Sequence, residues 1–518
     1  MEVLALRAAR PPFSLFYNVA NKGWVNLRGR PLFLTALFCL FVAFGSVFAS
    51  AAPDTLIVVT PSDIITLDPA RYTTHLPTEI VQRLIYAPLF DRDEATFVAA
   101  AATSLTARDP LTWVVDLAPG LTTHQGQSIT PSRVAQYINR LTSETGIGGY
   151  PAPARDRLGP VERASVVDGK LVLHLSRPWP SLPARLMAEP VAILDSQGQP
   201  IGTGPFRVER WDRGNRVVLE RVDDTSDQGM IRRIQFEVVP SADERLRRVL
   251  NGEAHIAFEL PPGAFWRLRA SRQAKPVVVP QSRVHFMEFA HTKPPFDDQK
   301  VRQALNMAVN TPALLRQLAQ GETEAVATAL SPVTLGFASD VLPYRYDPER
   351  ARQLLAEAGY PQGFAFELDV TRVKERVGRM YQAMLSEVGI DVSLRVWDTW
   401  QALREQILLG RRHAWLAEWG NSSLDPGTAI RPKLHSKGEA NYGGYDNPVL
   451  DAMLDEADAI LDPIERLEQY KLIQSYIRDD APMLFGYVEY DVFGASVHLD
   501  WWPGPGRWLA LDEARWIE

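Results

Sequence analysis

Residues 364–397 read FAFELDVTRVKERVGRMYQAMLSEVGIDVSLRVW, and this stretch contains the clearest fold signal in the chain. Residues 364–370 and 392–396 are short runs with the composition of strands. Residues 376–388 between them have the apolar spacing of a helix. A strand, a helix and a second strand in this order are typical of an α/β lobe. The stretch therefore predicts an α/β lobe in this part of the chain.

The remainder of the chain has the same mixed character. Residues 56–59 read as a short buried strand, and residues 79–89 have a helical apolar face. Thr130 and Pro131 stand where a helix N-cap and a first helical residue are expected. Residues 448–480 predict two helices interrupted at Asp462-Pro463. With 518 residues the chain is too long for one core, so two or three lobes are expected.

Composition excludes several classes of partner and cofactor. The formal net charge is −7 and no dense stripe of Lys and Arg occurs, so a nucleic-acid partner is not expected. The single cysteine, Cys39, lies in an apolar segment near the N-terminus, and the nine histidines show no metal-ligand spacing. The sequence therefore predicts no metal site and no cofactor.

The N-terminal region predicts export. Arg28 and Arg30 precede an apolar run over residues 31–48, which has about the length of a signal-peptide core. We therefore predict a signal peptide over residues 1–51. The alternative is an uncleaved signal that anchors the protein in the membrane.

Catalytic motifs give no support for an enzyme. The chain has no GxSxG nucleophile elbow, no phosphate-binding loop of the GxxxxGK[ST] kind and no HExxH zinc motif. Asp455 and Asp458 lie on one predicted helix face, where solvated charges are expected more often than a pair of catalytic carboxylates. The sequence therefore favours a binding protein.

Several short motifs occur in an order and spacing that resemble one family. They are Leu67-Asp68-Pro69, GTGPF at 202–206, PFDD at 295–298, YDPERARQLL at 346–355 and WGNSSLDP at 419–426. Over about residues 55–518 the chain resembles the family 5 extracytoplasmic solute-binding proteins of ABC importers, the oligopeptide, dipeptide and nickel type.

The resemblance implies an α/β protein with a type II fold like that of periplasmic binding proteins. Two α/β lobes would enclose a ligand cleft, and an extra lobe would be inserted. The implied divisions are lobe I over 52–78, 194–282 and 489–518, lobe II over 79–193, and lobe III over 283–488.

The resemblance also implies a function. A periplasmic monomer would capture a small solute, a peptide or peptide-like one in the first place, and deliver it to the permease and ATPase subunits of an ABC importer. It would meet the membrane only through the permease or an uncleaved signal. Two alternatives from other classes are an exported hydrolase acting on peptides or glycans, and a periplasmic sensor or chaperone.

The resemblance places seven residues at the ligand cleft. They are Thr73, Thr74, His75, Trp397, Trp419, Ser422 and Asp425. Ser422 stands where peptide-binding members usually have an Asp that pairs with the peptide ammonium group. A hydroxyl has no charge and makes a weaker hydrogen bond to an ammonium group, which argues against the usual binding of a free-amine peptide. Glu418 or Asp425 could replace the missing acid if the loop turned differently.

Other residues close in sequence to the cleft candidates have structural alternatives. Trp400 and Trp415 lie close in sequence to the two cleft tryptophans, but either could fill the core of the α/β lobe. Arg431 could meet a ligand carboxylate, but a solvated surface arginine is the simpler expectation.

Overall fold

The computed structural model describes residues 54–71, 75–93, 96–222, 229–261, 263–318, 323–420, 423–504 and 509–517. Residues 52–518 fold as one unit. The predicted signal peptide lies outside the described residues, as do Thr73, Thr74 and Ser422.

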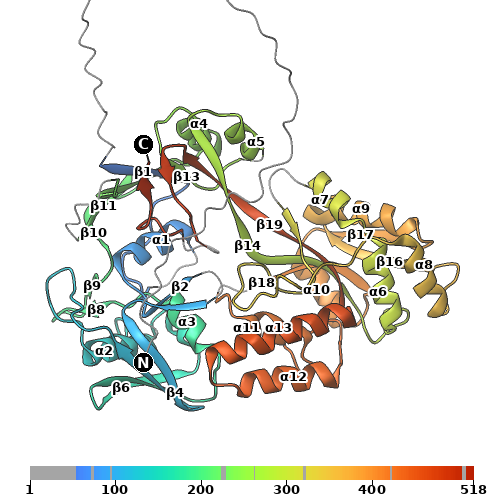
Figure 1. Ribbon diagram of the computed structural model, residues 1–518, viewed down its shortest axis with the longest axis horizontal. Coiled ribbons are helices and arrows are strands. Elements are labelled where there is room, and N and C mark those ends of the chain that lie inside the picture. Colours follow the sequence, from blue (N-terminus) through green and yellow to red (C-terminus); the bar gives the residue numbers. More distant parts are fainter. Residues whose placement is uncertain are drawn as a thin grey trace, which may run out of the picture. The chain divides into compact units, whose positions relative to one another are not determined.

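One long sheet joins the two halves of this unit (Figure 1). Parallel pairing of β1 with β12 and β13 builds the first half, and pairing of β16 with β17 and β18 builds the second. In spatial order the sheet contains β10 (Phe206–Asp212), β11 (Arg216–Arg221), β12 (Arg233–Val238), β1 (Thr55–Thr60), β13 (Ile256–Ala257), β19 (Met483–Ser496), β14 (Ala274–Phe289), β18 (Ala414–Gly420), β16 (Ala365–Thr371) and β17 (Asp391–Trp397), and β15 (Thr323–Ala325) pairs with β19.

The crossing strands β14 and β19 run from one half to the other. They are antiparallel partners from Ala274↔Ser496 to Glu288↔Met483. Their register shifts between Pro280 and Val284, which marks an irregular point in the middle of β14. The predicted lobe boundaries at 282/283 and 488/489 fall inside these two strands, and the division into three lobes stays a prediction.

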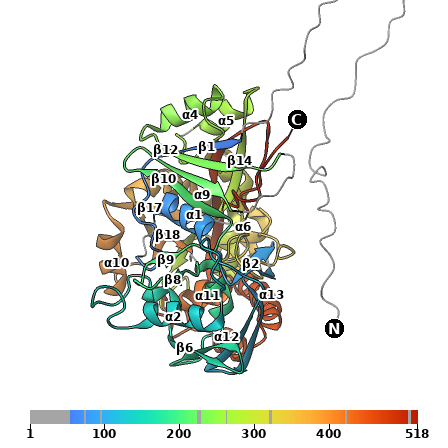
Figure 2. The ribbon, with the colours of Figure 1, turned by 90° about the vertical axis from the view of Figure 1, so that its left-hand side faces the viewer.

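The first half contains a second sheet at the end away from helices α4 (Ala242–Leu250) and α5 (Ala264–Arg269) (Figure 2). Its strand order is β4 (Ala102–Asp109), β5 (Thr112–Leu117), β7 (Lys170–Leu175), β6 (Val161–Val167). Helix α2 (Pro131–Thr142) packs on it, and Thr130 accepts a hydrogen bond from the backbone N–H of Arg133, which confirms the predicted helix start.

Helix α1 (Leu76–Ile85) corrects one sequence prediction. The helical face was expected over residues 79–89, but the helix begins three residues earlier and ends before Tyr86. Pro77 lies in its first turn, where proline is favoured, and Pro88 disfavours helical backbone in the residue before it. Leu89 is buried all the same, because it packs into the core of the first half.

The smaller elements of the first half are short helices and two-stranded ladders. They are η1 (Arg155–Leu158), α3 (Leu182–Ala188), β2 (Phe90–Asp93), β3 (Thr96–Ala99), β8 (Ile193–Leu194), β9 (Pro200–Ile201), β20 (Leu499–Asp500) and β21 (Arg515–Trp516). Residues near the C-terminus complete this half, because Trp501, Leu509 and Leu511 belong to its apolar core.

The second half has one apolar core on each face of the sheet. The predicted strand–helix–strand unit at 364–397 is confirmed as β16, α9 (Glu375–Ser386) and the parallel strand β17. One face of the sheet carries α9 together with η2 (Arg372–Lys374), α6 (Gln299–Ala308), α7 (Thr311–Leu318) and α8 (Pro348–Glu357). The other face carries α10 (Trp400–Leu408), α11 (Pro426–Leu434), α12 (Pro448–Ala459) and α13 (Pro463–Asp480).

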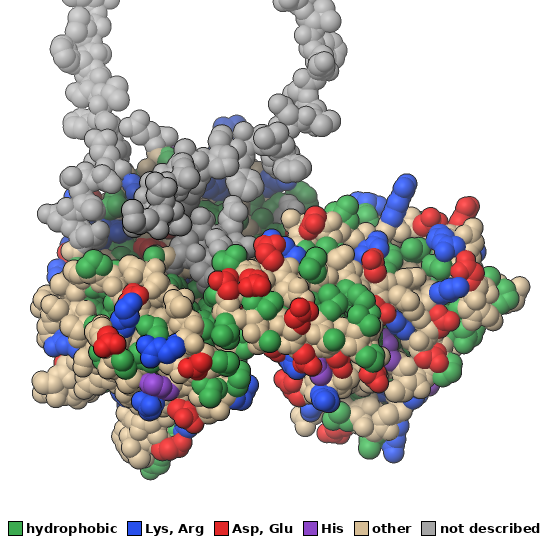
Figure 3. Space-filling model, turned by 60° about the horizontal axis from the view of Figure 1, so that its bottom comes forward, with side chains coloured by type: hydrophobic (Ala, Val, Ile, Leu, Met, Phe, Trp, Pro, Cys, Tyr) green, Lys and Arg blue, Asp and Glu red, His purple; other side chains and the backbone are tan. Residues whose placement is uncertain are grey.

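The predicted interruption at Asp462-Pro463 is confirmed between α12 and α13. Asp462 caps α13 by accepting from the backbone N–H groups of Ile464 and Glu465. On the face of the protein shown in Figure 3, a notch separates the two halves, and acidic, basic and apolar side chains are interspersed on both. Within the described part of the chain, every helix is too short or too polar to cross a membrane.

Candidate functional site

Strand β18 has neighbours on both edges only at its beginning. Strand β14 pairs with all of it, from Phe289↔Ala414 to Arg283↔Gly420. Strand β16 pairs only with Ala414 and Trp415. Among the described residues, Leu416–Gly420 therefore has no neighbouring strand on that second edge. Backbone groups on an open edge can pair with an extended ligand.

Trp419 lies on this open segment, and its indole is fixed by contacts with α11. Its indole Nε1–H donates to the carbonyl oxygen of Ala429 at 2.7 Å. The Lys433 ammonium nitrogen lies 5.3 Å from the centre of the Trp419 ring and 4.7 Å from that of Tyr442. Such cation–π contacts are attractive. The half-buried indole is therefore fixed in orientation before any solute arrives.

Lys433 is itself buried and paired. Its ammonium group donates to the Glu288 carboxylate at 2.8 Å, and Glu288 also accepts from the indole N–H of Trp415 at 3.2 Å. Sequence patterns do not reveal Lys433, because a lysine in α11 is expected at the surface unless its partner on β14 is known. The Lys433–Glu288 pair thus lies in the protein interior, directly behind the rings of Trp419 and Tyr442.

Trp415 fills the core, as one of the two readings from sequence expected. Its side chain is 1% exposed and packs in the apolar core between the sheet and helices α11–α13. Trp400, by contrast, is 38% exposed, with its ring centre 6.5 Å from that of Tyr442. The described structure thus separates a core indole from a surface one.

Trp397 ends β17 and is anchored by a buried acid. Its indole N–H donates to Asp369 Oδ1 at 2.7 Å, and Arg412 donates to the same oxygen at 3.3 Å. Burial raises the pKa of the Asp369 carboxyl above its ordinary value, although both donors oppose this. The indole of Trp397 is half-buried and packs beside the same core as Trp419.

His75 precedes α1 and joins two hydroxyl groups. Its Nε2 lies 2.7 Å from Ser62 Oγ and its Nδ1 lies 2.9 Å from Thr78 Oγ1. Burial lowers the pKa of His75 below its ordinary value, so the ring is neutral at pH 7. Whether His75 and its predicted companions touch a solute stays a prediction.

Asp425 caps α11 and is fully engaged by the protein. Its Oδ1 accepts from the backbone N–H of Gly427 at 2.9 Å, and Arg466 Nη1 donates to its Oδ2 at 2.7 Å. Burial by itself would raise the pKa of Asp425, but Arg466 brings it below the ordinary value. The carboxylate is 2% exposed, so a solute ammonium group would have to compete with Arg466.

Glu418 is also paired already. Lys374 donates to its Oε2 at 3.0 Å and Arg283 to its Oε1 at 2.5 Å. Burial pushes the pKa of Glu418 up, but Lys374 brings it below the ordinary value. Two cations therefore neutralise the acid that was considered as a substitute for the missing Asp at 422.

Arg431 lies close to carboxylates of α12. It donates to Asp455 at 2.6 Å and lies 3.0 Å from an Asp458 oxygen. These ion pairs account for its charge, and they also engage the two aspartates that the sequence analysis set aside as catalytic candidates.

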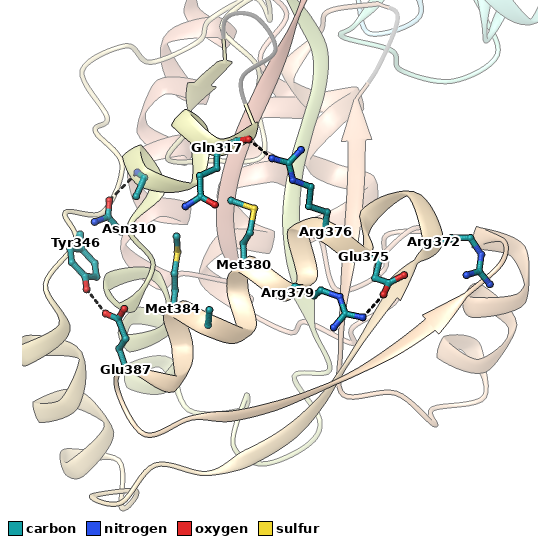
Figure 4. Close-up of a pocket in the computed structure, with 12 residues that line it drawn as sticks. Asn310, Gln317, Tyr346, Arg372, Glu375, Arg376, Arg379, Met380, Met384 and Glu387 are labelled. Atoms are coloured by element: carbon teal, nitrogen blue, oxygen red, sulfur yellow. Dashed lines mark hydrogen bonds and ion pairs between the residues drawn. The ribbon is translucent and has the colours of Figure 1, made fainter. Parts of the chain in front are cut away.

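A pocket of about 820 Å³ lies elsewhere in the second half, between α7 and α9 (Figure 4). Met380 and Met384 project toward Gln317 and Asn310 across it, and Arg376 donates to the backbone oxygen of Gln317. None of the four described cleft candidates, His75, Trp397, Trp419 and Asp425, lines it. Among the described residues, no group of three or more His, Cys, Asp or Glu side chains is placed to hold a metal ion.

Comparison with known sequences identifies a family. The sequence model of the bacterial extracellular solute-binding proteins, family 5 (middle region), matches residues 96–441. The glutathione-binding protein GsiB of Escherichia coli K12 is 27% identical over 497 residues, which cover 90% of this chain and 95% of that protein. GsiB of Salmonella typhi is 26% identical over 495 residues with the same coverage.

Solved structures share the fold. The unliganded open form of MppA, a periplasmic murein tripeptide-binding protein, has a TM-score of 0.81 at 19% identity and covers 90% of this chain and 98% of MppA. A nickel ABC transporter structure from Bacillus halodurans has a TM-score of 0.79 at 19% identity, with coverage of 89% and 99%. The predicted type II fold is confirmed.

Proposed function

Because the chain belongs to the bacterial extracellular solute-binding proteins of family 5, we propose that it captures an extended, peptide-like solute for an ABC importer. The chain is a solute-binding receptor and not an enzyme, as the sequence analysis predicted. The class of solute, the cleft residues and the partner subunits are the proposal.

The open edge of β18 is the observation that carries this proposal. An extended solute with backbone amides would add a strand beside Leu416–Gly420, where β16 no longer pairs. Trp419 and Trp397 would bound the solute with indole faces whose N–H groups are already satisfied. Such a site would recognise a solute mainly through its main-chain amides and less through its side chains.

The charges at the site favour a solute without a free main-chain ammonium group. Glu418 is neutralised by Lys374 and Arg283, and Asp425 by Arg466. Ser422 supplies no charge. A buried ammonium group without a counter-charge is costly. We therefore propose N-blocked peptides, or tripeptides whose ammonium group stands on a side branch beside a carboxylate of the same solute, as in the glutathione of the GsiB relatives.

The location of the protein and its mode of action complete the proposal. Residues 1–51 would direct export to the periplasm, where the chain would act as a monomer. A solute that binds both halves would shift the population toward a closed form by its difference in affinity for the two forms. The closed form would dock on the permease, and a separate ATPase subunit would power transport.

Isothermal titration of residues 52–518 tests the proposal. Glutathione, a free-amine tripeptide and its N-acetyl form should be compared, together with versions of the best binder N-methylated at one amide each. We expect the acetylated peptide or glutathione to bind more tightly than the free-amine peptide. At least one N-methyl group should cost about tenfold in affinity, the value of a lost hydrogen bond. Equal affinity across the N-methyl series would rule out strand addition at β18.

A further inference from the structure

The two halves meet at a second place besides the crossing strands. Ser181 precedes α3 in the first half, and its Oγ donates to Asp425 Oδ1 in the second half at 2.9 Å. The two residues are 244 positions apart, and both side chains are buried. In Figure 1, α3 accordingly lies beside the beginnings of α11 and α13, well away from β14 and β19.

The Ser181 hydroxyl is used for this contact and not for its own helix. Serine at an N-cap position ordinarily accepts a hydrogen bond from a backbone N–H of the first turn. Ser181 makes no such bond, although it is the N-cap of α3. Helix α3 therefore gives up a local stabilising interaction, and the hydroxyl serves a contact between the halves.

Asp425 connects this hydroxyl to the second half. It ends the segment that follows Trp419, caps α11 and pairs with Arg466 of α13. Gly427 makes the approach possible, since a Cβ there would lie 2.3 Å from Arg466 Nη2. Hydrogen bonds to a buried charged group are among the stronger ones in proteins.

Apolar packing surrounds these polar groups. Leu335 and Leu467 of the second half belong to the same apolar core as α1, α2 and α3 of the first. The backbone N–H of Leu335 donates to the carbonyl oxygen of Leu424 at 2.8 Å, one residue before Asp425. The contact is therefore buried, and Leu424 beside Asp425 is held by the backbone of Leu335.

We propose that Ser181, Asp425 and Arg466 form an interlobe latch. The halves are joined by β14 and β19 at one place and by the latch at another, so opening the protein wider than in this structure requires breaking the Ser181–Asp425 bond. The latch thereby favours the closed arrangement and positions Asp425 at the beginning of α11. The inference rests on the proposed function only in taking the region around Trp419 as the solute site.

Distance measurement between spin labels tests the latch without any solute. Residues 52–518 contain no cysteine, so Val166→Cys on β6 and Val449→Cys on α12 give one label on each half. Both positions are exposed, at 43% and 55%. In the ligand-free protein, Ser181→Ala should lengthen and broaden the distance distribution obtained by double electron–electron resonance. Ser181→Thr, which keeps the hydroxyl, should resemble the parent.

A matched serine separates the latch from general destabilisation. Ser386→Ala removes a hydroxyl that bonds only within α9, to the Ala383 oxygen at 2.7 Å. It should leave the distances unchanged even if it lowers the melting temperature. If Ser181→Ala gave the parent distribution at a temperature where it is fully folded, the latch would be overturned and Ser181 would be a packing residue.

Solute affinity gives an independent reading. With glutathione as the probe, Ser181→Ala should weaken binding about tenfold, as expected for a lost hydrogen bond to a charged group. Unchanged glutathione affinity in Ser181→Ala would count against the latch. If the parent itself failed to bind glutathione, that solute would be excluded from the proposed function, and the distances would still decide on the latch.

Discussion

The two parts of β18 differ in how many neighbouring strands they pair with, although they belong to one strand of seven residues. Ala414 and Trp415 lie between β14 and β16 and are buried. Within the described part of the chain, Leu416–Gly420 has β14 on one edge and no strand on the other, and its last three residues are half-buried. Trp415 and Trp419 stand four residues apart and so face the same side.

The comparison separates two uses of a tryptophan. Trp415 has its N–H on a buried acid and its ring inside the core, so its role is structural. Trp419 has its N–H on a backbone oxygen, and its side chain is only half-buried. The same residue type therefore serves folding at the flanked end, and under the proposed function it would serve recognition at the open end.

The largest expected effect is on stability at the flanked end. Trp415→Ala leaves a cavity and removes a donor from Glu288, so unfolding free energy should fall by about 3–5 kcal/mol. Urea unfolding followed by circular dichroism measures this. Trp400→Ala, at an exposed position of α10, is the matched control and should cost under about 1 kcal/mol. Equal losses would remove the distinction between core and surface indoles.

The second effect concerns acid. His285 lies opposite Glu418 in the ladder, its ring stacks on Tyr487, and Lys374, Arg283 and Glu489 surround it. Burial, helped by Lys374, lowers the pKa of His285 to about 4. Because the unfolded chain binds a proton near pH 6.5 and the folded one does not, stability should be full above that pH and fall as the pH drops toward 4.

Between pH 6.5 and pH 4 the free energy of unfolding of the parent should fall as His285 gains a proton on unfolding. The His285→Gln variant should lose about 2 kcal/mol less over the same pH range. The measurement is urea unfolding at a series of pH values. A slope unaffected by His285→Gln would mean that other buried groups, such as His291, whose pKa burial lowers to about 3, account for acid sensitivity.

A third, smaller effect belongs to recognition at the open end. Trp419→Ala should weaken solute binding about tenfold, since aromatic contacts contribute up to about 1.5 kcal/mol beyond buried area. Trp419→Phe should retain much of the affinity. Titration calorimetry with the best solute of the series measures both. An alanine variant that bound as well as the parent would place the solute elsewhere.

The smallest effect is expected at the exposed charge of the open end. Arg283 is 61% exposed at its side chain, and Lys374 remains to pair Glu418 when it is removed. Arg283→Gln should therefore change stability by less than about 1 kcal/mol. Urea unfolding at low and high salt should give nearly the same difference from the parent. A larger, salt-sensitive loss would show that the open end depends on this ion pair.

Sequence patterns predicted the local elements well, because their signals are local. The strand–helix–strand unit at 364–397 and the break at Asp462-Pro463 are confirmed, since apolar spacing and proline act within a few residues. The end of α1 was misplaced because burial of Leu89 does not require a helix. The type II fold followed from the resemblance, and the comparisons confirm it.

The site itself was less predictable. Trp415 is buried and Trp419 is half-buried because β16 stops pairing with β18 after Trp415. The sequence of residues 414–420 carries no signal for the place where this pairing ends. Lys433–Glu288 and Ser181–Asp425 join residues 145 and 244 positions apart, and no spacing rule reaches that far. The seven residues placed at the cleft by resemblance stay predictions, three of them outside the described residues.

The winding of the chain between the halves has a consequence for biosynthesis. Strand β13 of the first half pairs with β19, and Trp501, Leu509 and Leu511 complete its core. A ribosome makes these residues after most of the second half, so the half that emerges first is finished after the other. A chain cut short before residue 483 would present an unpaired strand edge and an unfilled core, and so invite aggregation and degradation.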